Sequence, residues 1–326
     1  MANIEILGTG MAACGAAHRL NQEGADFALH DMHAYPGGHT ATFRDAKGFI
    51  FDDGPHISFT KDARIQELFA RNVEGEYEVI HANVANYWRG HWIKHPAQCN
   101  LYGLPPDLIV KILQDFVEVH DRGDFNARNY ADWLVGTYGK TFAEMFPMEY
   151  GLKYHTTPAE NMTTVWLGPR LYRPSLEEIL RGALVPQTPD VHYVSDFRYP
   201  RYNGFVSYLK PFFERNKVHL SRRLMRLDTK SKKLHFSDGT IIPYDFVISS
   251  IPLPDLISAI EGVPADVIDA SRRLACSTCV TVNLGIARED ISPAHWTYFY
   301  DRDIFFTRLS FPHMLSPNTV PPGHSS

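Results

Sequence analysis

The apolar and polar positions near the N-terminus form three short patterns in succession. Residues 4–7 are a mostly apolar run, which predicts a buried parallel strand that needs no alternation because both of its faces are covered. Gly8 and Gly10 interrupt the run, and an alanine-rich segment with helical spacing of apolar residues continues to residue 20. A second apolar run at residues 27–30 predicts another strand. Strand, glycine turn, helix and strand in this order are typical of a Rossmann-like α/β fold.

The rest of the chain alternates between helical and extended patterns. Helices are expected from residue 61 onward and at residues 107–120, 130–154 and 205–216. Strands are expected in a hairpin of residues 40–44 with 49–52, a pair within 84–95, 217–220, a pair of 224–227 with 233–236, and a buried strand within 244–252. Three further strands, at 280–286, 295–300 and 305–311, are expected to form one sheet. A chain of 326 residues is long enough for two lobes.

The first turn has the residues that a diphosphate requires. Gly8 allows a tight turn, and Gly10 has no side chain to keep a phosphate from the backbone. Ala13 and Gly15 let the helix lie close to the strand while its N-terminal amides point at the anion. Asp31 follows the glycines by about twenty residues, where a ribose hydroxyl would bind. This context favours dinucleotide binding over an ordinary glycine-rich turn, but it leaves the dinucleotide open.

A glycine doublet soon after Asp31 favours one dinucleotide. Gly37 and Gly38 offer bare backbone amides to a second side of a pyrophosphate, which an extended nicotinamide cofactor does not need. Residues 52–56 follow as Asp-Asp-Gly-Pro-His. In its acid-x5-Gly-Gly and Asp-x-Gly-x-His segments the chain resembles the FAD-dependent amine oxidase superfamily, in the branch of protoporphyrinogen oxidases and UDP-galactopyranose mutases. The arginine usual before the doublet is replaced by Tyr35-Pro36.

The resemblance implies a two-lobe α/β flavoprotein with a Rossmann-like FAD/NAD(P)-binding domain and a mixed substrate domain of helices plus antiparallel sheet. The FAD-binding domain would comprise residues 1–60 and 200–255, and the substrate domain residues 61–199 and 256–326. The implied FAD contacts are Gly8, Gly10, Met11, Ala12, Ala13, Asp31, Met32, Gly37, Gly38, His39, Thr40, Gly54, Pro55, His56, Leu224, Ser250 and Pro252. We place His56 beside the isoalloxazine as the candidate catalytic residue, with a turn histidine bonded to its own loop as the alternative.

Later segments resemble the same branch. Trp166 and Arg170 match a Trp-x-x-x-Arg segment whose arginine faces the substrate cavity, and Tyr199 begins a Tyr-Pro-x-x-Gly-Gly segment in which Asn203 replaces the first glycine. The segments around Tyr298 and Arg308 resemble eukaryotic-type UDP-galactopyranose mutases, where the arginine reaches the UDP diphosphate. The Asn-Tyr-Ser-Pro that normally follows is Met-Leu-Ser-Pro at residues 314–317, so the substrate tyrosine is absent. The implied substrate-binding residues are therefore Arg170, Tyr298 and Arg308.

Three functions follow from these features. The first is an FAD-dependent oxidoreductase of amine-oxidase or protoporphyrinogen-oxidase type, in which a small-molecule substrate donates hydride to the flavin. The second is a mutase-like flavoenzyme acting on a nucleotide sugar, with Arg170 and Arg308 clamping the UDP diphosphate. The third is a truncated or degenerate non-catalytic paralogue, because related proteins continue past this C-terminus with a Gly-Asp segment at the flavin pyrophosphate.

Composition narrows the partners and the compartment. A net charge of −5 argues against a nucleic-acid partner. No apolar stretch approaches the ~18 residues of a membrane helix, and the N-terminus lacks the basic region of a signal peptide. Four cysteines without a framework spacing indicate a reducing cytoplasm. We expect Cys276 and Cys279 to be a buried, unreactive pair, and His91 and His95 to be polar-face histidines of a strand, so no metal site is expected.

Overall fold

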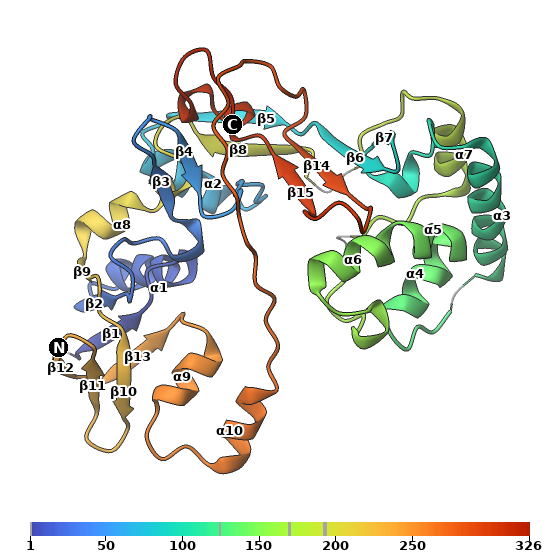
Figure 1. Cartoon of the computed structure of the whole chain (residues 1–326). Helices are drawn as coiled ribbons and strands as arrows, with labels where there is room; N and C mark the ends of the chain where they lie inside the picture. Colours follow the sequence, from blue (N-terminus) through green and yellow to red (C-terminus); the bar gives the residue numbers. More distant parts are fainter. Residues whose placement is uncertain (1, 124, 169–170, 192–193) are drawn as a thin grey trace. The chain divides into compact units, whose positions relative to one another are not determined.

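The computed structural model describes residues 2–123, 125–168, 171–191 and 194–326. The chain divides into two compact units (Figure 1). Unit 1 comprises Met1–Glu78, Arg198–Ala287 and Ser316–Ser326, and unit 2 comprises Val79–Phe197 and Arg288–Leu315. The chain therefore leaves unit 1 after residue 78, returns at residue 198, leaves again after residue 287 and returns at residue 316. The assignment of FAD to one unit and of substrate to the other stays a prediction. Within the described residues, no helix is both long and apolar enough to cross a membrane.

A four-stranded parallel sheet forms the centre of unit 1. Its order is β13-β1-β2-β9, from β1 (Ile4–Leu7), β2 (Phe27–His30), β9 (Lys217–His219) and β13 (Phe246–Ser249). The helix α1 (Met11–Gln22) connects β1 to β2 and packs on the sheet through Ala13 and Ala17, which contact Ile6 and Leu29 in one buried cluster. Small residues on this face of α1 let the helix lie close to the strands, so the predicted Rossmann-like fold is confirmed. The role expected of Gly15 in this packing is wrong, because Gly15 is exposed and nothing lies within 4 Å of a Cβ added to it.

The remaining elements of unit 1 surround this sheet. The predicted hairpin is β3 (Thr42–Arg44) with β4 (Ile50–Asp52), and an antiparallel meander is formed by β10 (Leu224–Asp228), β11 (Lys233–Phe236) and β12 (Ile241–Pro243). The helices are α2 (Ala63–Asn72), α8 (Lys210–Arg215), α9 (Leu253–Ala259) and α10 (Ala265–Arg272). A two-stranded pair, β5 (Tyr77–His81) and β8 (Asp196–Pro200), contains the points at which the division between the units falls.

Unit 2 combines a small mixed sheet with a helical layer. The sheet has the order β15-β14-β6-β7, from β6 (Val84–Trp88), β7 (His91–Lys94), β14 (Trp296–Phe299) and β15 (Arg308–Ser310). The helices are α3 (Pro106–Arg122), α4 (Tyr130–Tyr138), α5 (Lys140–Met145), α6 (Pro147–His155) and α7 (Leu176–Leu184). Their apolar faces share one core with the sheet, in which Trp88 contacts Phe146 and Phe146 stacks on Phe142.

Three further sequence expectations are wrong. Residues 280–286 form no strand, and Val280 and Val282 are 84% and 76% exposed. Their alternating pattern favours an extended chain, but a strand needs a continuous hydrogen-bonded neighbour. Within the described residues this segment forms only an isolated bridge, from Ile286 to Ser325. β13 is an edge strand and not a buried one, with Phe246 62% exposed. Cys276 and Cys279 lie in the extended segment that follows α10 and are exposed free thiols.

Candidate functional site

The turn between β1 and α1 contains two glycines with different roles. Gly8 has a φ of +105°, and a Cβ built on it would lie 2.3 Å from the Ser250 Oγ. Its amide donates to the carbonyl of His30 at 2.7 Å, which fixes the turn against β2. Gly10 is extended, with φ −73° and ψ −175°, and the nearest atom to its added Cβ would be the Gly37 carbonyl oxygen at 3.8 Å. Gly8 is therefore required by the fold, whereas Gly10 leaves space above the turn.

The N-terminus of α1 opens onto that space. Gly10 is its N-cap residue and provides no side-chain cap, and the first turn contains no acidic residue. The amides of Met11, Ala12 and Ala13 have no carbonyl partner within the helix, because the first turn of any α-helix lacks them. Together with the helix dipole they form a site for an anion. This arrangement fits the pyrophosphate of a dinucleotide.

The glycine doublet lies directly against this turn. A Cβ on Gly38 would lie 3.1 Å from the Cα of Gly10. Gly38 begins the short 3-10 helix Gly38–Thr40, and the Thr40 hydroxyl donates to the Gly37 carbonyl at 2.7 Å. His39 lies within the same turn. The structure thus brings together the two glycine segments that the sequence places 28 residues apart, counting from Gly10 to Gly38.

Thr9 connects the two glycine segments to the acid at the end of β2, and the sequence analysis did not identify it. Its side chain is fully buried; the hydroxyl accepts from the Gly37 amide at 3.1 Å and donates to Asp31 Oδ2. The Thr9 amide also donates to Asp31 Oδ2, at 3.0 Å, and the His33 amide donates to Asp31 Oδ1 at 3.0 Å. Asp31 is 7% exposed and accepts these three hydrogen bonds, so its carboxylate organises the turn, whereas its contact with a ribose stays a prediction. The sequence signal that could have identified Thr9 is a polar residue between two glycines at the end of a buried strand.

His56 makes the contact that its alternative interpretation predicts. Its Nδ1 lies 2.7 Å from the Gly54 carbonyl oxygen, and its ring lies 5.4 Å from that of Phe205. Pro55, which lies between Gly54 and His56 in the sequence, is exposed. The hydrogen bond fixes the ring orientation, which is compatible with either role for His56.

The sequence analysis also missed the function of Asp52, which anchors this loop. Its Oδ1 accepts from the Thr42 hydroxyl at 2.6 Å and from the Phe205 amide at 2.9 Å, and its Oδ2 accepts from the Tyr199 hydroxyl at 2.7 Å. Loss of water around the carboxylate raises the pKa of Asp52, although these three donors and the nearby His56 oppose the shift. Asp52 therefore joins the loop of His56 to the segment by which the chain returns to unit 1.

The remaining predicted cofactor residues lie at the edges of the same unit. Leu224 begins β10 and packs in the cluster that contains Leu7. The Ser250 hydroxyl donates to the Leu7 carbonyl at 3.0 Å, and Pro252 precedes α9. Met32 is 46% exposed just after Asp31. Ser250 lies beside the glycine turn through its approach to Gly8, whereas a cofactor contact of Leu224, Pro252 or Met32 stays a prediction.

In unit 2, two of the three predicted substrate residues are neighbours. Tyr298 on β14 and Arg308 on β15 are directly paired across the antiparallel ladder, and Arg308 is exposed. Tyr150 on α6 joins them, with its ring 5.5 Å from that of Tyr298. Burial and the Tyr298 phenol raise the pKa of Tyr150, whereas the Arg308 charge lowers it. Arg170 lies outside the described residues.

His95 contacts this group through Tyr298. Its ring lies 5.3 Å from that of Tyr298, and its Nδ1 lies 3.1 Å from Asn86 Oδ1. His91 instead bonds the Gly103 carbonyl, so the two histidines point to different partners. Among the described residues, no group of three or more His, Cys, Asp or Glu side chains could hold a metal.

Comparison with known proteins identifies the fold. Residues 6–71 match the NAD(P)-binding Rossmann-like domain. Reduced UDP-galactopyranose mutase superimposes with a TM-score of 0.90 at 24% identity, over 100% of this chain and 73% of that chain. A protoporphyrinogen oxidase-like protein from Exiguobacterium sp. 255-15 gives 0.73 at 14% identity, over 99% and 75%. An oxidoreductase from Methanosarcina mazei gives 0.66 at 14% identity, over 99% and 77%. The resemblance to this branch of flavoprotein folds is therefore confirmed at the level of fold.

Proposed function

We propose that the chain is an FAD-dependent enzyme of the oxidoreductase type that oxidises a small molecule. The observation that carries this proposal is the open position at Gly10, which faces the Gly37-Gly38 doublet at the uncapped N-terminus of α1. Two glycine-lined backbones at one helix N-terminus suit a pyrophosphate approached from two sides. When bound, FAD supplies the redox chemistry, and the protein supplies binding, orientation and electrostatics.

The residues of unit 1 have separate tasks in this proposal. The amides of Met11, Ala12 and Ala13 hold the pyrophosphate, with Gly10 and Gly38 leaving room for its oxygens. A carboxylate has about four lone-pair positions, and the internal donors to Asp31 occupy three of them. The free position on Asp31 is available to a ribose hydroxyl.

The His56 loop is the part of unit 1 that we place at the flavin ring. Asp52 and Tyr199 hold the loop in place, and the Gly54 carbonyl orients the imidazole of His56. In this arrangement His56 positions substrate or excludes water at the ring face. We propose no general base.

The decisive test is FAD retention. The purified protein is desalted, its flavin absorbance is compared with its protein absorbance, and FAD is titrated into the apo-protein and into the Gly10→Ala variant. We expect saturable FAD binding that raises the melting temperature of the parent and is weakened in the variant. A colourless protein that FAD does not stabilise would instead support the non-catalytic paralogue.

A mutase-like reaction on a nucleotide sugar is the second candidate. It is supported by the exposed Arg308, which pairs with Tyr298 across the ladder of β14 and β15, because a guanidinium can bind a diphosphate in two-pronged geometry. Calorimetric titration with UDP tests it. Saturable binding that is lost in Arg308→Ala and retained in the control Arg181→Ala, an exposed arginine of α7 paired with Glu177, supports the mutase. If no heat of binding is detected up to millimolar UDP, the mutase-like function is ruled out.

The proposals on partners and location rest on composition. With a net charge of −5, a small-molecule substrate is proposed and a nucleic-acid partner is not. Four free cysteines, Cys14, Cys99, Cys276 and Cys279, are consistent with a reducing compartment, and we propose the cytoplasm.

A further inference from the structure

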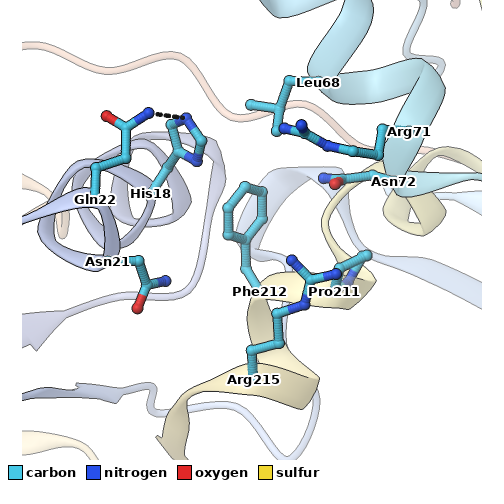
Figure 2. Close-up of a pocket in the computed structure, with 9 residues that line it drawn as sticks. All are labelled: His18, Asn21, Gln22, Leu68, Arg71, Asn72, Pro211, Phe212 and Arg215. Atoms are coloured by element: carbon cyan, nitrogen blue, oxygen red, sulfur yellow. Dashed lines mark hydrogen bonds between the residues drawn. The ribbon is translucent and has the colours of Figure 1, made fainter. Parts of the chain in front are cut away.

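A groove on unit 1 lies between three helices and takes no part in the proposed FAD site. It is formed by the C-terminal halves of α1 and α2 together with α8, and its volume is about 260 Å³. Figure 2 shows its lining, which is His18, Asn21, Gln22, Leu68, Arg71, Asn72, Pro211, Phe212 and Arg215. Ligand pockets for drug-sized molecules are commonly about 300–1,000 Å³, so this groove suits a smaller ligand.

The floor of the groove is apolar and fixed by packing. Phe212 is 8% exposed and shares a buried cluster with Cys14 of α1 and Leu209, against which Leu68 of α2 also packs. The His18 ring meets Phe212 edge-on at 5.9 Å. The three helices are therefore held together beneath the groove, which makes it a preformed cavity and not a gap between loosely placed elements.

The rim of the groove is positively charged. The guanidinium groups of Arg71 and Arg215 extend into the space around the Phe212 ring (Figure 2), and both side chains are exposed. In the part of the chain that the structure describes, neither guanidinium has an acidic partner within ion-pair distance. Two acids near the groove pair with other cations: Glu214 pairs with Lys210, and Glu23 pairs with Arg19.

A purely structural role for the two arginines has to be weighed against binding. Each lies in the last turn of its helix, where a cation offsets the helix dipole by about 0.3–1 kcal/mol. The last carbonyls of α2 already accept bonds from the amides that follow, as Val73 N to Phe69 O and Gly75 N to Ala70 O. In α8 the Phe212 carbonyl accepts from the side-chain amide of Asn216 at 2.8 Å. Hydrogen-bond capping of these carbonyls therefore requires neither arginine, whereas an anion in the groove would use both.

We propose that this groove binds a small organic anion, with its phosphate or carboxylate between Arg71 and Arg215 and its apolar or aromatic body on Phe212. Guanidinium groups bind both kinds of anion in two-pronged geometry. The site is separate from the FAD site, because ten residues of α1 between Met11 and Asn21 span about 15 Å. The groove lies at the opposite end of α1 from the glycine turn. The proposal does not depend on the proposed function.

The test uses the full chain saturated with FAD, so that the pyrophosphate site is filled, or the apo-protein if FAD does not bind. Phenyl phosphate and benzoate are titrated by calorimetry as the phosphate and carboxylate probes, with inorganic phosphate as the probe that lacks an apolar body. We expect saturable binding of phenyl phosphate, benzoate or both. For the probe that binds, Arg71→Gln and Arg215→Gln should each weaken binding about tenfold or more, and inorganic phosphate should bind more weakly than phenyl phosphate.

Arg64→Gln is the matched control, because Arg64 lies on α2 but pairs with Asp62 at the other end of the helix. Its affinity for the probe should equal that of the parent. Absence of saturable binding for both organic probes would overturn the proposal, as would equal affinity in the parent and both arginine variants. A lower melting temperature in the arginine variants without probe binding would assign both residues to helix capping.

Discussion

Alanine substitutions at the two glycines of the first turn separate a cofactor role from a structural one. At Gly10 the added methyl meets the Gly37 carbonyl oxygen at 3.8 Å and the Gly38 Cα at 3.9 Å, both ordinary contacts. The backbone is in a region open to every residue. Alanine lowers unfolded-chain entropy, which stabilises by about 0.4–1 kcal/mol. It is a poorer N-cap residue by a similar amount. The unfolding free energy of the apo-protein should therefore change by less than about 1 kcal/mol.

The FAD affinity of Gly10→Ala should respond differently. The methyl group fills the space between the uncapped amides of α1 and the glycine doublet, where we place a pyrophosphate oxygen. We expect FAD to bind at least about tenfold more weakly, which corresponds to about 1.4 kcal/mol. Flavin fluorescence titration measures the affinity, and urea denaturation without FAD measures the stability.

Gly8→Ala should show the opposite pattern. Its φ of +105° costs a non-glycine residue about 1–2 kcal/mol, and the new Cβ would overlap the Ser250 Oγ at 2.3 Å. The apo-protein should be destabilised, and Ser250→Ala should recover the steric part because the other neighbours lie at 3.6 Å or beyond. Gly15→Ala is the matched control: nothing lies within 4 Å of its added Cβ, so it should keep the parent FAD affinity. If Gly10→Ala binds FAD as the parent does, the pyrophosphate does not lie over this turn.

Three further predictions concern carboxylates of unit 1. Asp31→Ala should lower the FAD affinity, and it should lower the unfolding free energy of the apo-protein by about 1–3 kcal/mol because it removes three internal hydrogen bonds. Unchanged denaturation curves would contradict this role of the carboxylate. Burial raises the pKa of Asp52, so the stability that Asp52 contributes is present below about pH 4 and is lost as the pH rises through the raised pKa. Asp52→Asn should therefore flatten the pH dependence of the unfolding free energy between these two pH values, and parallel pH profiles of variant and parent would refute this. Glu5 and His30 form a buried hydrogen-bonded pair at 2.6 Å, so Glu5→Leu or His30→Phe alone should cost about 1–3 kcal/mol by leaving a buried polar partner unsatisfied. The double variant should cost less than the sum in chemical denaturation, and additivity would show that the pair is uncoupled.

The glycine turn was predictable because its requirements are local. A run of four residues, two glycines and a helix with small residues at Ala13 and Ala17 determine the strand, the turn and the close helix packing. The bare amides of Gly37 and Gly38 predict a second side of the same pyrophosphate site, and the structure places Gly38 directly against Gly10. Thr9 and Asp52 were missed because their function is to bond residues distant in the sequence, and no periodicity marks such partners.

The wrong expectations have a common physical origin. Residues 280–286 alternate apolar and polar side chains, and Cys276 with Cys279 has the spacing of a pair, but burial depends on what packs against a segment. Periodicity describes which side chains share a face and not whether anything covers that face. Only the end of 280–286 is met by another part of the described chain, at Gly285 by Phe49 and at Ile286 by Ser325. Val280 and Val282 therefore remain exposed on an extended segment.

Backbone conformation explains why Asn203 can replace the first glycine of the Tyr-Pro-x-x-Gly-Gly segment that begins at Tyr199. Asn203 has a φ of +63°, a left-handed conformation that asparagine adopts more readily than other non-glycine residues. Its Oδ1 accepts from an Arg44 guanidinium nitrogen at 3.4 Å. Gly204 permits no such replacement, because a Cβ there would lie 2.2 Å from the Thr42 Cγ2 and 2.8 Å from the Asp52 Oδ1. The second glycine of the motif is thus imposed by the hydrogen-bond network that holds the loop of residues 52–56, whereas the first only needs a residue that tolerates a positive φ.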